Sequence, residues 1–127
     1  MKNYNFENRL IFSLNESSLD KESFTTAINE LIEKSEILGV VYGEFDVPRP
    51  YDICSQNISH SFMKMRFENG NVYADVKILA TDKGKQIRSL MVALDDQNLE
   101  LFRFKPRAFG NDSGIIDEIT TFDICSK

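Results

Sequence analysis

The sequence contains a single histidine, His60, in the stretch QNISHSF at residues 56–62. An imidazole can act as a general base, bind a metal ion or pack in a protein core. A histidine base also needs a nucleophile within hydrogen-bond reach and a third group that orients its ring. Spacing alone identifies neither partner, so the local pattern predicts a half-buried strand histidine.

Three cations, Arg103, Lys105 and Arg107, alternate along the stretch LFRFKPRAF. Alternate residues of an extended chain point to the same side, so we expect the three charges on one side of a strand that runs into a loop. Charged side chains commonly protect a strand edge against pairing with other chains. They could also bind an acidic partner, and the sequence leaves both interpretations open.

No pattern indicates a cofactor or a metal ion. Cys54 and Cys125 are far apart and have no CxxC motif or neighbouring histidine, so we expect free thiols and no zinc site. The stretch TDKGK at 81–85 lacks the first glycine and the spacing of a phosphate-binding loop. The stretch GNDSG at 110–114 has the composition of an ordinary turn.

The overall composition is that of a globular protein, which we expect to form a single domain over residues 1–127. Fifteen basic and twenty acidic residues give a formal charge of −5, which argues against general binding to nucleic acid. No apolar run approaches the roughly 20 residues that a membrane helix needs. We therefore expect a protein made in a reducing cytoplasm, with no nucleic-acid or membrane partner.

The first half of the chain predicts strands at 8–14 and 40–45 around a helix at about 20–34. Ser17 and Asp20 have the spacing of a capping box before that helix, and Gly39 lies just past its end. The apolar positions of the helix repeat with the period of one helix face: Phe24, Ala27, Ile28 and Leu31.

The middle of the chain predicts an antiparallel hairpin of strands 58–68 and 72–79, joined by the Asn69–Gly70 turn. A change of parity near residues 62–63 indicates a bulge in the first strand. Two prolines at 48 and 50 predict a loop over 47–52.

The last third predicts a helix at about 82–94 capped by Thr81, a strand at 99–104, a loop at 105–114 and a strand at 115–124. The apolar stripe expected on this helix consists of Ile87, Leu90, Met91 and Leu94. Strands outnumber helices and hairpins dominate. The predicted fold is therefore α+β, with two helices and a mostly antiparallel sheet that is curled or barrel-like.

Five stretches in this order resemble the prohead core proteases of T-even-type tailed phages, which are similar in fold to herpesvirus assemblins. They span about residues 20–126, almost the whole chain: VVYGEFDVP, NISHSFMKM, NGNVYADVKILATDKGKQIRSLM, FRFKPRAFG and ITTFDICS. The resemblance implies a prohead-protease-like fold and a role in the maturation of phage heads, where the family cleaves scaffold and capsid proteins.

By this resemblance His60 matches the catalytic histidine and Asp123 matches a family aspartate. Arg107 matches the arginine of the family's Ser-Ser-Arg segment, so Lys105 and Pro106 stand where the serines should be. Proline has no nucleophilic atom and no N–H for an oxyanion, and a lysine amine attacks only when deprotonated. Val47 also replaces a histidine of the family pattern.

We therefore expect a pseudoenzyme: a non-catalytic capsid-associated protein, such as a decoration or auxiliary head protein. We expect its partners to be major capsid or scaffold proteins. We expect the protein in the host cytoplasm during assembly and then in the virion. The sequence leaves open whether the chain self-associates. One alternative is an active divergent protease that uses His60, Asp123 and an unaligned serine such as Ser113. Another is a pseudoenzyme that regulates an active protease.

Overall fold

The computed structural model describes residues 4–45 and 55–126, and the expected loop at 47–52, Val47 and Cys54 lie outside them. Four antiparallel strands form the larger sheet, in the spatial order β1-β4-β3-β2. Their bounds are Asn5–Ser13 for β1, Val41–Glu44 for β2, Ile58–Glu68 for β3 and Asn71–Ile78 for β4. The expected hairpin of β3 and β4 is confirmed, with a bulge between Met63 and Arg66.

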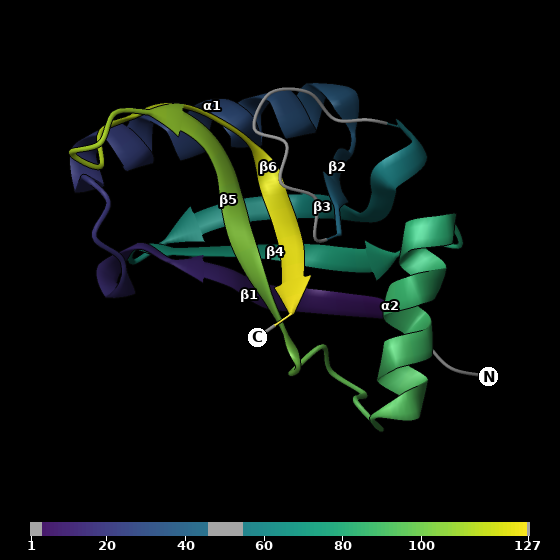
Figure 1. Cartoon of the computed structure of the whole chain (residues 1–127). Coiled ribbons are helices and arrows are strands. Elements are labelled where there is room, and N and C mark those ends of the chain that lie inside the picture. The colour runs from purple at the N-terminus through teal and green to yellow at the C-terminus, as the bar shows by residue number, and fades with distance from the viewer. Residues whose placement is uncertain (1–3, 46–54, 127) are drawn as a thin grey trace.

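The last two strands, β5 (Phe102–Gly110) and β6 (Ile116–Ser126), form a separate antiparallel hairpin. This hairpin lies across one face of the larger sheet (Figure 1). A parallel bridge between Phe45 and Ile124 connects the end of β2 to β6. Among the described strands β1 and β5 form no ladder, so the curled arrangement is not a closed barrel.

Helix α1 (Lys21–Leu38) packs on β6 and β3, and its buried face contains the four apolar residues expected from the sequence. The expected cap at Ser17 was wrong, because the carboxylate of Asp20 accepts the N–H of Ser23 instead. The hydroxyl of Ser17 donates to Leu14, at the end of a 3-10 turn, Leu14–Glu16. Gly39 ends α1 with φ of 82°, a left-handed conformation that favours glycine.

Helix α2 (Asp82–Ala93) packs at one end of the larger sheet, and its cap is Thr81 as expected. The expected apolar stripe was only half right. Ile87 and Met91 are buried, whereas Leu90 and Leu94 are exposed. A second 3-10 turn, Ser55–Asn57, precedes β3. No helix in the described part of the chain is long and apolar enough to cross a membrane.

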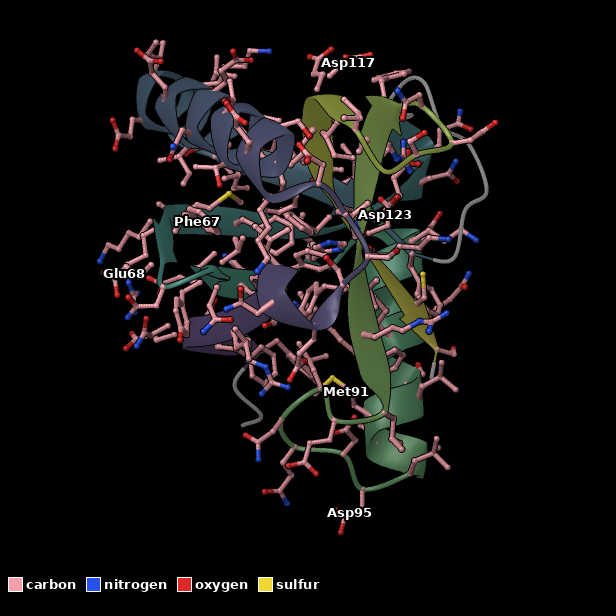
Figure 2. The ribbon with its side chains drawn as sticks, turned by 90° about the vertical axis from the view of Figure 1, so that its left-hand side faces the viewer. Phe67, Glu68, Met91, Asp95, Asp117 and Asp123 are labelled. Carbon is pink, nitrogen blue, oxygen red and sulfur yellow. The ribbon has the colours of Figure 1, made fainter. Side chains whose placement is uncertain are left out.

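The core fills the space between the larger sheet, the hairpin and α1 (Figure 2). Aromatic rings connect these layers, since Phe12 of β1 stacks on Phe24 of α1 at 5.3 Å between ring centroids. Phe62 of β3 and Phe122 of β6 meet edge to face at 6.4 Å. The side chains of β3 and β6 therefore meet in the centre of the molecule.

The strand β5 is longer than the sequence suggested, and its second half occupies the expected loop. Proline has no N–H for a strand ladder, so within a sheet it is tolerated mainly on an edge strand, such as β5 of this two-stranded hairpin. In the structure Pro106 lies opposite Phe122, whose carbonyl accepts a hydrogen bond from another strand. The carbonyl of Phe122 therefore has a hydrogen-bond partner although Pro106 has no N–H to donate, and β5 continues to Gly110.

Candidate functional site

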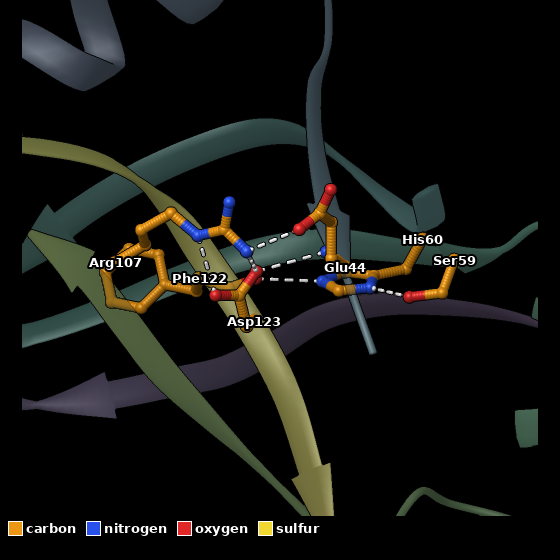
Figure 3. Close-up of polar contacts among 6 residues, drawn as sticks. All are labelled: Glu44, Ser59, His60, Arg107, Phe122 and Asp123. Carbon is orange, nitrogen blue, oxygen red and sulfur yellow. Dashed lines mark hydrogen bonds and ion pairs between the residues drawn. The ribbon is translucent and has the colours of Figure 1, made fainter. Parts of the chain in front are cut away.

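His60 lies on β3 between Gly43 of β2 and Ile78 of β4, and its side chain is fully buried. Its Nε2 is 2.8 Å from the carbonyl oxygen of Phe122 on β6. A carbonyl only accepts, so Nε2 carries the proton. Nδ1 then accepts the hydroxyl proton of Ser59 across 2.7 Å (Figure 3). Both ring nitrogens are therefore used.

A strand irregularity brings Ser59 and His60 together. Gly43 pairs with His60 and Glu44 pairs with Ile58, so Ser59 has no partner residue in β2. A bulge of this kind re-aims a side chain that would otherwise point to the opposite face of the sheet. This explains how two consecutive strand residues form one hydrogen-bonded pair.

Gly43 allows the close approach of the His60 ring. A Cβ atom at this position would lie 2.2 Å from Nε2 of His60 and 2.6 Å from the carbonyl oxygen of Phe122. Both contacts are too short for any side chain. Glycine at position 43 is therefore required for the hydrogen bond between His60 and Phe122.

The surroundings of the ring favour its neutral form. Phe62 and Phe104 contact it edge to face, at centroid distances of 5.0 and 6.2 Å. Burial lowers the pKa of His60 to about 4, and the bond to Phe122 opposes this shift. At neutral pH His60 is an uncharged donor and acceptor enclosed by aromatic rings.

A buried ion-pair network lies beside this ring and includes Asp123, the residue that follows Phe122 in β6. Arg107 of β5 binds Asp123 through Nε at 2.9 Å and through a terminal nitrogen at 3.1 Å. The same terminal nitrogen is 2.6 Å from a carboxylate oxygen of Glu44. The backbone N–H of Glu44 donates to Asp123 at 3.1 Å. These contacts tie β2 to the hairpin (Figure 3).

Burial and charge act in opposite directions in this network. Burial raises the pKa of Asp123, and the hydrogen bonds from Arg107 and Glu44 counteract it. Burial also disfavours the charged form of Arg107, but its bonds to Glu44 and Asp123 prevail and raise its pKa. The guanidinium is therefore a fixed cation whose donors already point at carboxylates.

The structure does not assemble His60, Asp123 and Ser113 into one site. The side chain of Asp123 binds Arg107, and the ring of His60 is oriented by the neighbouring carbonyl of Phe122. Ser113 lies in the exposed β5–β6 turn, where its N–H donates to Asn111. The start of β6 is six strand residues from Phe122, a span of roughly 20 Å along an extended strand, so this turn lies well along the hairpin from the residue that binds the ring.

The three expected cations point to one side of β5 but differ in exposure. Arg103 and Lys105 are exposed, whereas the side chain of Arg107 is 2% exposed and belongs to the ion-pair network. Only Arg103 and Lys105 therefore present their charges to solvent. Lys105 pairs across the hairpin with Asp123, and Pro106 pairs with Phe122.

Sequence reasoning missed two parts of this site. Ser59 is adjacent to His60 in QNISHSF, but strand alternation gives no reason for the two side chains to meet. The pairing of Glu44 with Arg107 joins residues 63 positions apart, and no spacing rule reports such a contact. The described residues contain no cluster of His, Cys, Asp or Glu that could hold a metal ion.

Among solved structures, the chain is similar to the bacteriophage T4 capsid assembly protease, gp21, with a TM-score of 0.60 and 13% sequence identity. The likeness covers 97% of this chain and 80% of that chain. At this identity it shows the fold alone, and it confirms the expected prohead-protease-like architecture. No protein-family model and no curated protein matches the sequence.

Proposed function

We propose that this chain is a non-catalytic component of phage head assembly, built on a prohead-protease-like fold. The observation that carries the proposal is the state of His60. The ring is fully buried, and both nitrogens are hydrogen-bonded within the protein. The likeness in fold to a capsid assembly protease supports the connection to head assembly.

The chemistry around His60 argues against proteolysis. A general base acts best with a pKa near the working pH, whereas the pKa of His60 is about 4. Ser59 is within hydrogen-bond reach, but it too is fully buried, so a peptide bond has no access to its hydroxyl. The resemblance that matches His60 to a catalytic histidine also puts Lys105 and Pro106 at the serine positions.

The proposed partners are major capsid or scaffold proteins, met in the host cytoplasm during assembly. A capsid lattice presents one binding surface many times, so contacts that are weak singly can give stable attachment if copies of the chain are linked or self-associate. This role requires an intact fold and an exposed surface, and it places no demand on a nucleophile.

The proposal is tested by coexpressing the chain with the capsid and scaffold proteins of the same genome and then sedimenting the heads. We expect the chain to sediment with the heads, while mass spectrometry finds the capsid and scaffold proteins uncut by it. Site-specific cleavage that a folded His60→Ala or Ser59→Ala variant no longer performs would overturn the non-catalytic role. Absence of the chain from assembling heads would overturn the structural role.

One observation favours a second function, an active serine protease. The hydroxyl of Ser59 donates to His60 at 2.7 Å, and Phe122 orients the other ring nitrogen, as a nucleophile and base require. Such an enzyme would need a rearrangement that exposes the pair. A fluorophosphonate probe separates the two functions, because labelling of wild type but not of Ser59→Ala would establish a reactive Ser59. Labelling that only Ser113→Ala abolishes would instead assign the nucleophile to the hairpin turn.

A further inference from the structure

The helix α2 has an exposed face without charged residues. Its members are all exposed and are spaced with the period of one helix face: Gln86, Ser89, Leu90, Ala93 and Leu94. The large apolar side chains of Leu90 and Leu94 are 38% and 60% exposed. We call these residues the α2 face. Charged residues make up 28% of the chain, so a helix face without one differs from the charged outer face of an ordinary surface helix.

The α2 face is accessible to another molecule. Ile87 and Met91 are buried on the inner side of the helix, which packs on β3 and β4. The helix stands at the edge of the molecule, beyond the end of the larger sheet (Figure 1). No helix or strand among the described residues covers Leu90 or Leu94.

The two halves of the α2 face differ in shape. The half before Leu90 borders a shallow hollow of about 420 Å³, lined by Phe45, Asp82, Lys85, Gln86, Ser89 and Leu90. The half after Leu90 carries the protruding side chain of Leu94. When two such helices pack antiparallel about a two-fold axis at Leu90, Leu94 of each copy lies opposite Gln86 of the other. The apolar side chain of one copy then lies over the hollow of the other, so the α2 face is complementary to itself.

The charges that flank the α2 face agree with the same pairing. Lys85 precedes Leu90 by five residues and Asp95 follows it by five, and both are exposed. The axis at Leu90 therefore places Lys85 of each copy opposite Asp95 of the other, in the flanking positions where paired helices carry salt bridges. Asp82, the carboxylate at the hollow, lies opposite the uncharged Asn98. The pairing thus joins opposite charges twice and brings no like charges face to face.

Within a single copy, three of these charges are placed against the dipole of α2. A helix dipole favours anions near its first turn and cations near its last turn. Lys83 and Lys85 lie near the start of α2, its last turn has no basic residue, and Asp95 follows its end. In an antiparallel pair, Asp95 of one copy approaches the start of the other helix. A second copy therefore compensates an arrangement that is unfavourable in the isolated chain.

We propose that two copies of this chain associate through α2, antiparallel about a two-fold axis at Leu90. Leu94 of each copy lies in the hollow of the other, and Lys85 pairs with Asp95. This inference deepens the proposed function, because a dimer has two head-binding surfaces and gains avidity on a capsid lattice. The benefit for head binding rests on the proposed function, whereas the association itself does not.

Sedimentation velocity of the purified full chain, over concentrations from about 10 µM to 1 mM, tests the association. We expect a monomer–dimer equilibrium with a dissociation constant of about 10–100 µM, since one helix face is smaller than a standard interface. Leu94→Gln should weaken the dimer by about tenfold or more. The matched control Val92→Gln changes a side chain that is 54% exposed on another side of the same helix, and it should leave the equilibrium unchanged.

A charge exchange tests the antiparallel register. Lys85→Asp and Asp95→Lys should each weaken the dimer by about tenfold, because each creates two pairs of like charges. The double variant should restore the wild-type dissociation constant to within about threefold, since it inverts both pairs. Lys64→Asp, on the bulge of β3, is the control for the change in net charge and should have no effect.

Disulfide trapping locates the axis. In a chain with Cys54→Ser and Cys125→Ser, Leu90→Cys should form a linked dimer on mild oxidation, because a residue on the axis meets its own copy. Val92→Cys should stay monomeric. A monomer at every concentration, a charge exchange without rescue, or equal linkage at positions 90 and 92 would overturn the inference. No capsid or scaffold protein enters these measurements, so their failure is distinct from a failure to sediment with heads.

Discussion

The ring of His60 and the backbone carbonyl of Phe122 form a hydrogen bond of 2.8 Å that joins the larger sheet to the hairpin at the centre of the molecule. The bond links residues 62 positions apart, and both side chains are fully buried. The only histidine of the chain therefore connects two layers of the fold.

Replacing His60 with alanine should lower the free energy of unfolding by about 3 kcal/mol, because it leaves a cavity and an unpaired carbonyl. Ser59→Ala is the matched control, since it removes only the bond to Nδ1 and should cost about 1 kcal/mol. Urea denaturation measures both values. Equal losses of under 1 kcal/mol would show that the bond to Phe122 is dispensable.

Gly43→Ala should destabilise the fold by about 3 kcal/mol, because the added Cβ would displace the His60 ring from Phe122. Gly39→Ala is the control, since nothing lies within 4 Å of its added Cβ and only its φ of 82° is strained. That strain should cost about 1 kcal/mol. If Gly43→Ala costs the same amount in a His60→Ala background, the clash with the ring is not the cause.

Stability should depend on pH through His60. Its pKa is about 4 in the folded protein and about 6.5 in the unfolded chain, so between these values only the unfolded chain takes up the proton. Stability from this group is complete above pH 6.5 and falls by about 3 kcal/mol on acidification to pH 4. The difference between wild type and His60→Gln in urea denaturation isolates this effect from the carboxylates. A flat difference from pH 7 to 4 would contradict it.

Arg107→Met should cost about 3–5 kcal/mol, because it removes the cation between the buried carboxylates of Glu44 and Asp123. Arg103→Met on the exposed side of β5 should change stability by no more than about 0.5 kcal/mol. Acidification should partly restore the Arg107 variant, since protonation neutralises the carboxylates that have lost this cation. Stability that falls at the same rate with pH in variant and wild type would argue against this account.

Most local elements, and their order along the chain, were predictable from the amino-acid sequence. Amphipathic periodicity located α1 through Phe24, Ala27, Ile28 and Leu31, and the Asn69–Gly70 pair located the central hairpin. Thr81 marked the start of α2. These features depend on neighbours within a few residues, so the pattern of side chains is sufficient to predict them.

The covered face of each element and the contacts between distant groups depend instead on how the elements pack together. Leu90 and Leu94 follow the helical period but remain exposed, because no element among the described residues covers that side of α2. Pro106 lies within a strand because β5 is an edge strand of a two-stranded hairpin, and the carbonyl of Phe122 opposite it is bound by His60. Arg107 shares a side of β5 with Arg103 and Lys105, but only its position meets Glu44. The role of His60 as a buried hydrogen-bonding residue also depends on tertiary packing. Its burial, the bulge at Ser59 and the space above Gly43 exist only once β2, β3 and β6 have come together.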